Sequence, residues 1–190
     1  MESRLLNAAD MGAGWMGTTV VSSTELGTLA ESPCPGVSID ASVTARLRPV
    51  VGVRLTPMDG TNRAVIEGVI VGEAANLDAD VQALLDAAAS CLGTDFTSEK
   101  DEKVRYDSLL LPALGDQQMA TVMVINQPPD HQLTVRGHTA IVRVGQSVVS
   151  LTQYEVMTNP EAAAITSDAA FVELLRTAVE RLAGESSSAA

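Results

Sequence analysis

The chain has 190 residues, of which 46% are hydrophobic, 19% are charged and only 3% are aromatic. This composition excludes a chain that is disordered throughout, and the length allows one domain with a substantial, mainly aliphatic core. The formal net charge of -12 would repel the phosphates of a nucleic acid, so we expect no nucleic-acid partner. No apolar run approaches the roughly 20 residues that a transmembrane helix needs.

Three glycines near the N-terminus, Gly12, Gly14 and Gly17, match the GxGxxG spacing of dinucleotide-binding proteins. Such a site needs a strand before the glycines and a helix after them, because the pyrophosphate lies at the N-terminus of that helix. Here a helix-like run, residues 5–10, comes first, and TTVVSST, a poor helix former, follows. We therefore interpret this segment as a flexible loop that holds Trp15, and we expect no cofactor.

Runs rich in Val, Ile and Thr predict strands in the middle of the chain. The runs 48–56 and 62–71 are separated by the turn sequence PMDG, and together they predict a hairpin. Two further strands are predicted at 104–111 and 117–125. Aliphatic residues at helical spacing predict helices on either side of this β-rich region.

The first of these helices is expected over 77–92, with Asn76 as its N-cap. The second is expected over 168–183, where Ser167 precedes the apolar stripe as the N-cap. Both helices end near a glycine, which is typical of helix C-termini.

A hairpin over residues 133–157 is the strongest local signal in the sequence. β-branched residues dominate both halves, and the chain reverses at Gly145 and Gln146 without a proline in either half. If the loop has two residues, one face of the hairpin is apolar near the turn and polar further from it. The facing pairs are Val142 with Val149, Ala140 with Leu151, His138 with Gln153, and Arg136 with Glu155.

Hairpins, combined with two helices that cannot both be crossovers of a parallel sheet, predict an α+β fold. We expect an antiparallel sheet of about six strands with the two main helices packed on one face, forming a cleft. Leu85 and Leu175, one from each helical stripe, are predicted to lie in the core. A single domain is expected over residues 1–184, followed by a disordered tail at 185–190.

The residues that often bind metals or act as nucleophiles show no recognised spacing. Cys34, Cys91, His131 and His138 form none of the CxxC or HExxH patterns of zinc sites, so we expect no metal. There is neither a GxSxG nucleophile motif nor a P-loop. Because Cys91 lies near a helix C-terminus, which disfavours a thiolate, it is interpreted as a buried thiol or a disulfide partner.

Short apolar phrases recur along the chain in a recognisable order. They are LLNAADMGAGW, Cys34 in a Pro-flanked loop, a helix ending at Cys91, LLLPALGD, VRVGQSVVSL and AAFVELLRTAVERL. Over residues 4–183 this order resembles the extracellular sensor domain of PknH-type mycobacterial receptor kinases and related actinobacterial lipoproteins. The resemblance implies an antiparallel sheet with two helices, and a cleft for an extracellular ligand.

The resemblance also bears on the cysteines and on location. Together with the count of two cysteines, it implies a disulfide between Cys34 and Cys91, although the second disulfide of the kinase domain has no counterpart here. It implies an extracytoplasmic protein whose leader is absent from this sequence. A cytoplasmic protein with two free thiols is the alternative.

We expect the polar end of the central hairpin to form the floor of a ligand cleft, because ligand sites combine apolar walls with a few convergent polar groups. The predicted floor residues are Arg136, His138, Gln153 and Glu155. The predicted walls are Trp15, Tyr106, Met119, Met123 and Tyr154, which supply adaptable apolar surface. The alternative is that the polar residues face water and the wall residues only fill the core.

Two functions are compatible with such a cleft. The first is a domain that binds a small apolar molecule, as the sensor resemblance implies. The second is a cofactor-independent enzyme, a cyclase or isomerase of an apolar biosynthetic substrate, which would act by holding a reactive conformer in the same cleft.

Overall fold

The computed structural model describes residues 4–20, 34, 37–97, 101–126, 133–157 and 166–184. Within them the strands are β1 (Trp15–Val20), β2 (Val51–Pro57), β3 (Arg63–Val71), β4 (Asp95–Thr97), β5 (Lys103–Ser108), β6 (Gln117–Asn126), β7 (Thr134–Val144) and β8 (Ser147–Met157). The helices are the 3-10 helix η2 (Ala8–Met11) and the α-helices α1 (Ala41–Arg46), α2 (Ala74–Ala89) and α3 (Asp168–Ala183). The predicted tail, 185–190, lies outside the described residues.

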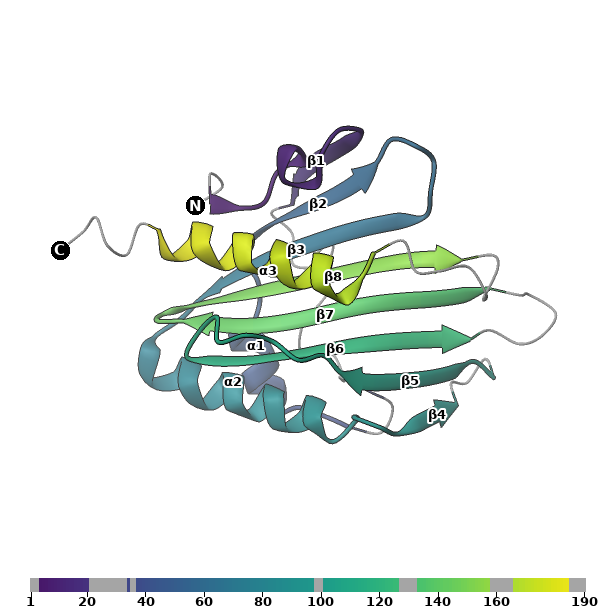
Figure 1. The fold of residues 1–190 in the computed structure, drawn as a ribbon. Helices are drawn as coiled ribbons and strands as arrows, with labels where there is room; N and C mark the ends of the chain where they lie inside the picture. Colours follow the sequence, from purple (N-terminus) through teal and green to yellow (C-terminus); the bar gives the residue numbers. More distant parts are fainter. Residues whose placement is uncertain are drawn as a thin grey trace.

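The strands form an antiparallel sheet in the order β1-β2-β3-β8-β7-β6-β5-β4 (Figure 1). The predicted α+β class is confirmed, but the sheet has eight strands where about six were expected. The sequence pattern missed the two edge strands. β1 contains Gly17 and begins at Trp15, in a segment interpreted above as a loop, and β4 is only three residues long.

The predicted register of the central hairpin is confirmed. Val142 lies opposite Val149, and Arg136 lies opposite Glu155. Gly145 has a φ of 58°, in the left-handed region that glycine adopts without strain, so the two-residue turn closes the hairpin in this register. β8 then pairs with β3, which places this hairpin in the middle of the sheet.

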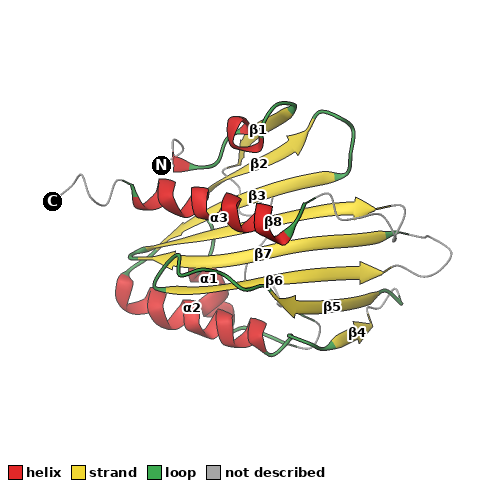
Figure 2. Ribbon diagram, in the orientation of Figure 1, coloured by secondary structure: helices red, strands yellow, loops and turns green. Residues whose placement is uncertain are grey.

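The two main helices cover opposite faces of the sheet, so the prediction that both pack on one face is wrong. Val142 and Val149 belong to a buried cluster that includes residues of α3, whereas Ile141 and Val148 belong to a second cluster with residues of α2. Figure 2 shows α3 in front of the central strands. The consecutive apolar residues 140–142 are typical of a strand that is buried on both sides. This run distinguishes a sheet with a helix on each face from a sheet with both helices on one face.

We refer to these sides as the α3 face and the α2 face. On the α3 face, Leu175 is fully buried, as predicted, and on the α2 face Leu85 is partly buried against the second cluster. The helix α3 begins after Ser167, whose hydroxyl accepts from the backbone N–H of Ala170, so the predicted N-cap is confirmed. The predicted N-cap of α2 is wrong, because the helix begins two residues before Asn76.

A disulfide joins Cys34 to Cys91, as the resemblance implied. Both residues are buried, and the bond attaches the segment before α1 to the C-terminal end of α2. Within the described ranges, no helix combines the length and hydropathy required to cross a lipid bilayer.

Candidate functional site

A groove of about 440 Å³ lies on the α3 face, between α3 and the part of the sheet that leads to β1. We call it the α3 groove. Its walls come from η2, the first residues of β1 and β3, one residue of β8 and the exposed side of α3. The lining residues are Asp10, Met11, Trp15, Arg63, Gln153, Thr166, Ala170, Glu173, Leu174 and Thr177.

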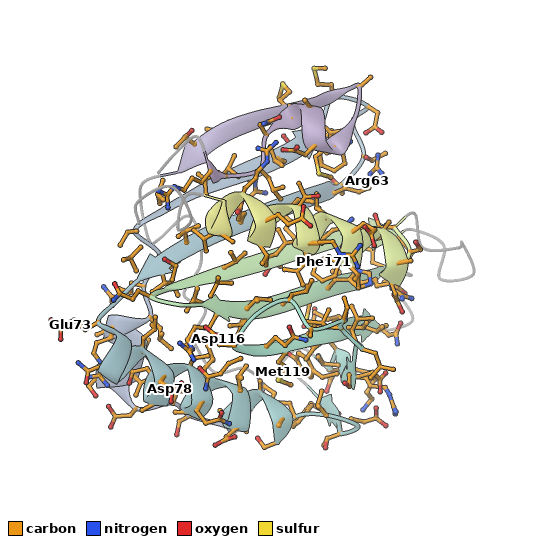
Figure 3. All side chains as sticks on the ribbon, turned by 60° about the vertical axis from the view of Figure 1, so that its left-hand side comes forward. Arg63, Glu73, Asp78, Asp116, Met119 and Phe171 are labelled. Carbon is orange, nitrogen blue, oxygen red and sulfur yellow. A yellow bond between two sulfur atoms is a disulfide. The ribbon has the colours of Figure 1, made fainter. Side chains whose placement is uncertain are left out.

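The N-terminal end of α3 is held on the sheet by two predicted site residues. His138 Nε2 lies 2.9 Å from Asp168 Oδ1, and the Arg136 guanidinium donates to the same oxygen at 2.8 Å. The His138 ring stacks on Phe171, with ring centroids 4.9 Å apart and planes inclined by 20°. Figure 3 shows Phe171 on α3, on the side that faces the sheet. Arg136 and His138 therefore position the helix that forms one wall of the groove.

This contact also changes the acidity of the helix-terminal carboxylate. The hydrogen bond from His138 lowers the pKa of Asp168, and the hydrogen bond and charge of Arg136 act in the same direction, against the opposing effect of desolvation. Asp168 occupies the first turn of α3, where a negative charge also stabilises the helix.

Gln153 is the buried polar residue of the groove floor. Its side chain is only 5% exposed, and its Nε2 donates to the hydroxyl of Thr166 on the opposite wall. Its Oε1 is buried and has no hydrogen-bond partner among the described residues. A buried amide oxygen normally accepts a hydrogen bond, so the missing partner marks Gln153 as a candidate residue for binding a molecule in the groove.

The charged residues that line the groove are engaged in ion pairs with residues around it. Asp10 binds Arg181, Arg63 binds Asp59 at 2.8 Å, and Glu173 binds Arg176 at 2.8 Å. Arg63 also lies over the ring of Trp15, with its guanidinium carbon 5.4 Å from the ring centroid, and Figure 3 marks its position on β3. This contact is within the distance range of a cation–π interaction.

Next to the groove, a buried acid holds the N-terminal segment on the sheet. Glu67 is fully buried and accepts a hydrogen bond of 2.6 Å from the backbone N–H of Leu6. Arg181 of α3 donates to the carbonyl oxygen of Leu5 at 2.7 Å. Burial raises the pKa of Glu67 to about 7, although the bond from Leu6 and the charge of Arg181 partly oppose this shift.

We expect stability to fall as the pH rises from about 4.5 to about 7. In that window Glu67 ionises in the unfolded chain but keeps its proton in the folded protein. Protonation therefore favours the folded state. The free energy of unfolding should be about 3 kcal/mol lower above pH 7 than below pH 4.5. Glu67→Gln, which mimics the protonated acid, should remove this part of the pH dependence.

Urea unfolding of wild type and Glu67→Gln at pH 5 and pH 8 measures the difference. The exposed residue Glu73 provides the control, because Glu73→Gln should leave the wild-type pH dependence intact. A Glu67→Gln protein that loses as much stability as wild type between the two pH values would contradict the expectation.

The nine predicted ligand-binding residues do not line one cleft, because alternate strand positions divide them between the two faces of the sheet. On the α3 face lie Arg136, His138, Gln153, Glu155 and Trp15, of which Gln153 and Trp15 line the α3 groove. On the α2 face lie Tyr106, Met119, Met123 and Tyr154. Tyr154 there accepts a hydrogen bond from Arg54, and Glu155 lies opposite both Arg63 and Arg136 in the strand register.

Sequence reasoning missed several residues that build the groove. Asp168 and Thr166 are far along the chain from the hairpin residues that they contact, and no local pattern connects them. Glu67 was detectable, since it is the single charged residue in the apolar run 64–71 of a predicted strand.

A second, smaller pocket of about 110 Å³ lies on the α2 face. It is enclosed by the C-terminal half of α2 and by strands β5, β6 and β7. Its lining residues are Leu84, Ala88, Cys91, Tyr106, Met119, Thr121, Thr139 and Ile141. Two of the predicted wall residues, Tyr106 and Met119, are therefore part of a different site from Trp15 and Gln153.

Comparison with known proteins relates this chain to others through its structure. No protein-family model matches the sequence, and neither does any curated protein. The extracellular domain of PknH from Mycobacterium tuberculosis matches with a TM-score of 0.60 at 16% identity, covering 96% of this chain and 94% of that domain. A putative uncharacterised protein from Mycobacterium smegmatis matches with a TM-score of 0.50 at 12% identity, covering 91% of each chain. The expected resemblance is thus confirmed in the structure: this chain has the fold of the PknH extracellular domain.

Proposed function

We propose that this protein is a small-molecule binding domain whose ligand lies in the α3 groove. The observation that carries the proposal is Gln153 on the groove floor, whose buried Oε1 has no hydrogen-bond partner among the described residues. Leaving such an acceptor without a partner costs free energy that a bound donor would recover. The resemblance to a receptor kinase's extracellular domain is compatible with this function.

The groove favours a ligand that has both apolar and polar surface and carries a hydrogen-bond donor. Met11, Trp15 and Leu174 supply apolar surface, and the Gln153 amide supplies the acceptor. The acidic and basic residues lining the groove are held in ion pairs, which disfavours catalysis by proton transfer. The alternative of a cyclase or isomerase that holds a reactive conformer needs no such residues, and turnover of an apolar substrate would favour it over binding.

We also propose an extracytoplasmic location. The Cys34–Cys91 disulfide supports it, because disulfides persist in oxidising compartments and are rare in the cytosol of most cells. The fold shared with an extracellular domain is compatible with the same location.

The groove can be tested with N-phenyl-1-naphthylamine, an uncharged and mostly apolar fluorophore with one N–H donor. Trp15 is the single tryptophan of the chain and lines the groove, so its emission reports on this site. We expect saturable quenching of Trp15 by energy transfer to the bound probe. Gln153→Leu should weaken binding by about fivefold, because one hydrogen bond contributes about 1 kcal/mol.

A matched pair of variants on α3 tests the location. Ala170 lines the groove, whereas its neighbour Ala169 is exposed and does not. Ala170→Phe should fill the groove and weaken probe binding by at least about tenfold, while Ala169→Phe should leave it unchanged. Absence of saturable quenching in the wild type, or equal binding by both variants, would show that the groove is not the site.

A further inference from the structure

The pocket on the α2 face has a composition suited to an apolar guest. Leu84, Cys91 and Ile141 are buried and form its inner wall, and the other lining residues are partly exposed. Figure 3 marks Met119 on β6, on the side of the sheet where α2 lies. An apolar lining offers water few hydrogen-bond partners, so such a pocket is suited to a small apolar molecule.

The pocket exists because one turn of α2 carries a smaller side chain in the apolar stripe than the turns before it. Leu77, Val81 and Leu84 fill the space between the helix and the sheet in successive turns, but the next position of the stripe is Ala88. The helix end cannot move freely toward the sheet to close the gap, since Cys91 is tied to Cys34. A gap between helix and sheet forgoes the apolar contacts that a longer side chain would make there, so the pocket calls for an explanation.

We infer that this pocket is a second binding site, which takes a benzene-sized apolar ring or branched alkyl group carrying one hydrogen-bonding oxygen. The volume of about 110 Å³ sets the size of this group. Met119 supplies an adaptable side chain, and Tyr106 supplies an aromatic wall. The inference does not depend on the proposed function, because the pocket and the α3 groove lie on opposite faces of the sheet.

The preference for an oxygen atom comes from two threonines in the pocket wall. The hydroxyl of Thr139 lies 3.4 Å from that of Thr152 on the neighbouring strand. The hydroxyl of Thr121, in contrast, makes no hydrogen bond to another side chain among the described residues. Because a hydroxyl group can both donate and accept, Thr121 can bind a phenolic or alcoholic oxygen in the pocket.

Methionine methyl resonances can follow this site and the groove separately. Met119 lines the pocket and Met11 lines the α3 groove, so selective ¹³C labelling of methionine methyl groups reports on both. Benzene and phenol serve as probes, and Met119→Leu and Met11→Leu assign the two signals. We expect benzene to shift the Met119 resonance saturably and to leave the Met11 resonance in place, and we expect phenol to bind at Met119 more tightly than benzene.

Two variants test the geometry. Ala88→Leu should fill the pocket, weaken benzene binding by at least about tenfold and raise the melting temperature, whereas Ala89→Leu, on the exposed side of α2, should change neither. Thr121→Val keeps the shape but removes the hydroxyl, and it should weaken phenol binding by about fivefold without affecting benzene. A Met119 resonance that stays unchanged up to the solubility limit of benzene would overturn the inference. So would benzene binding that survives Ala88→Leu in a folded protein, or equal binding of phenol and benzene.

Discussion

Replacing both cysteines, by Cys34→Ala with Cys91→Ala, is expected to lower the free energy of unfolding by about 4 kcal/mol. The disulfide joins residues that are 57 positions apart, so it closes a long loop in the unfolded chain and reduces the conformational entropy of that state. Both side chains are buried, and alanine is small enough to occupy either position without a clash. The effect should therefore come mainly from the lost covalent connection.

Urea unfolding with and without a reducing agent measures this contribution. The reducing agent should destabilise the wild type to about the level of the double variant and should have no effect on the double variant itself. Denatured, unreduced wild type should show no titratable thiol. Two titratable thiols per chain, or an unchanged urea midpoint in the double variant, would contradict the prediction.

Phe171→Ala is expected to lower the free energy of unfolding by about 3–5 kcal/mol. Phe171 is fully buried in the cluster on the α3 face, where its ring also stacks on His138. Truncation removes apolar surface from the core and leaves a cavity between α3 and the sheet. It also removes the contact that holds the His138 ring next to Asp168, so the position of the helix terminus should be affected.

The other phenylalanine of the chain provides a matched control. Phe96 is partly exposed on the short edge strand β4, where it contacts Tyr106 edge to face. Phe96→Ala should therefore cost much less than Phe171→Ala in the same thermal or urea unfolding experiment. Equal losses in the two variants would mean that α3 is not held mainly by its buried side chains.

The Phe171 variant also separates stability from binding. If α3 forms a wall of a ligand groove, a variant that loosens this helix should weaken binding of the fluorescent probe along with stability. Gln153→Leu should weaken binding with a smaller effect on stability than Phe171→Ala, since it removes one described hydrogen bond, from Nε2 to Thr166, and leaves no large cavity. The two variants therefore distinguish the support of the groove from its contacts with a ligand.

Part of the candidate site could be predicted from the sequence. Gln153 and Trp15 were both predicted, and both line the groove. The hairpin register identified the face of Gln153, whereas Trp15 was expected as adaptable apolar surface. The position of Asp168 could not be predicted from the sequence, since it lies 30 residues from His138 and contacts it only when α3 packs on the sheet. Arg136 and His138 were predicted as floor residues, but their described contacts are with α3, so a role in ligand contact remains a prediction.

The sequence by itself determined the local features of this protein. Gly145 and the alternating β-branched residues specify the central hairpin and its register, and Ser167 with the following apolar stripe specifies where α3 begins. Only the tertiary structure decided which face of the sheet each helix covers. Strand alternation assigns Met119 and Gln153 to opposite faces, but it does not say which helix packs over either, because that depends on contacts between residues far apart in the chain. One predicted cleft thus became a groove and a pocket on opposite sides of the sheet.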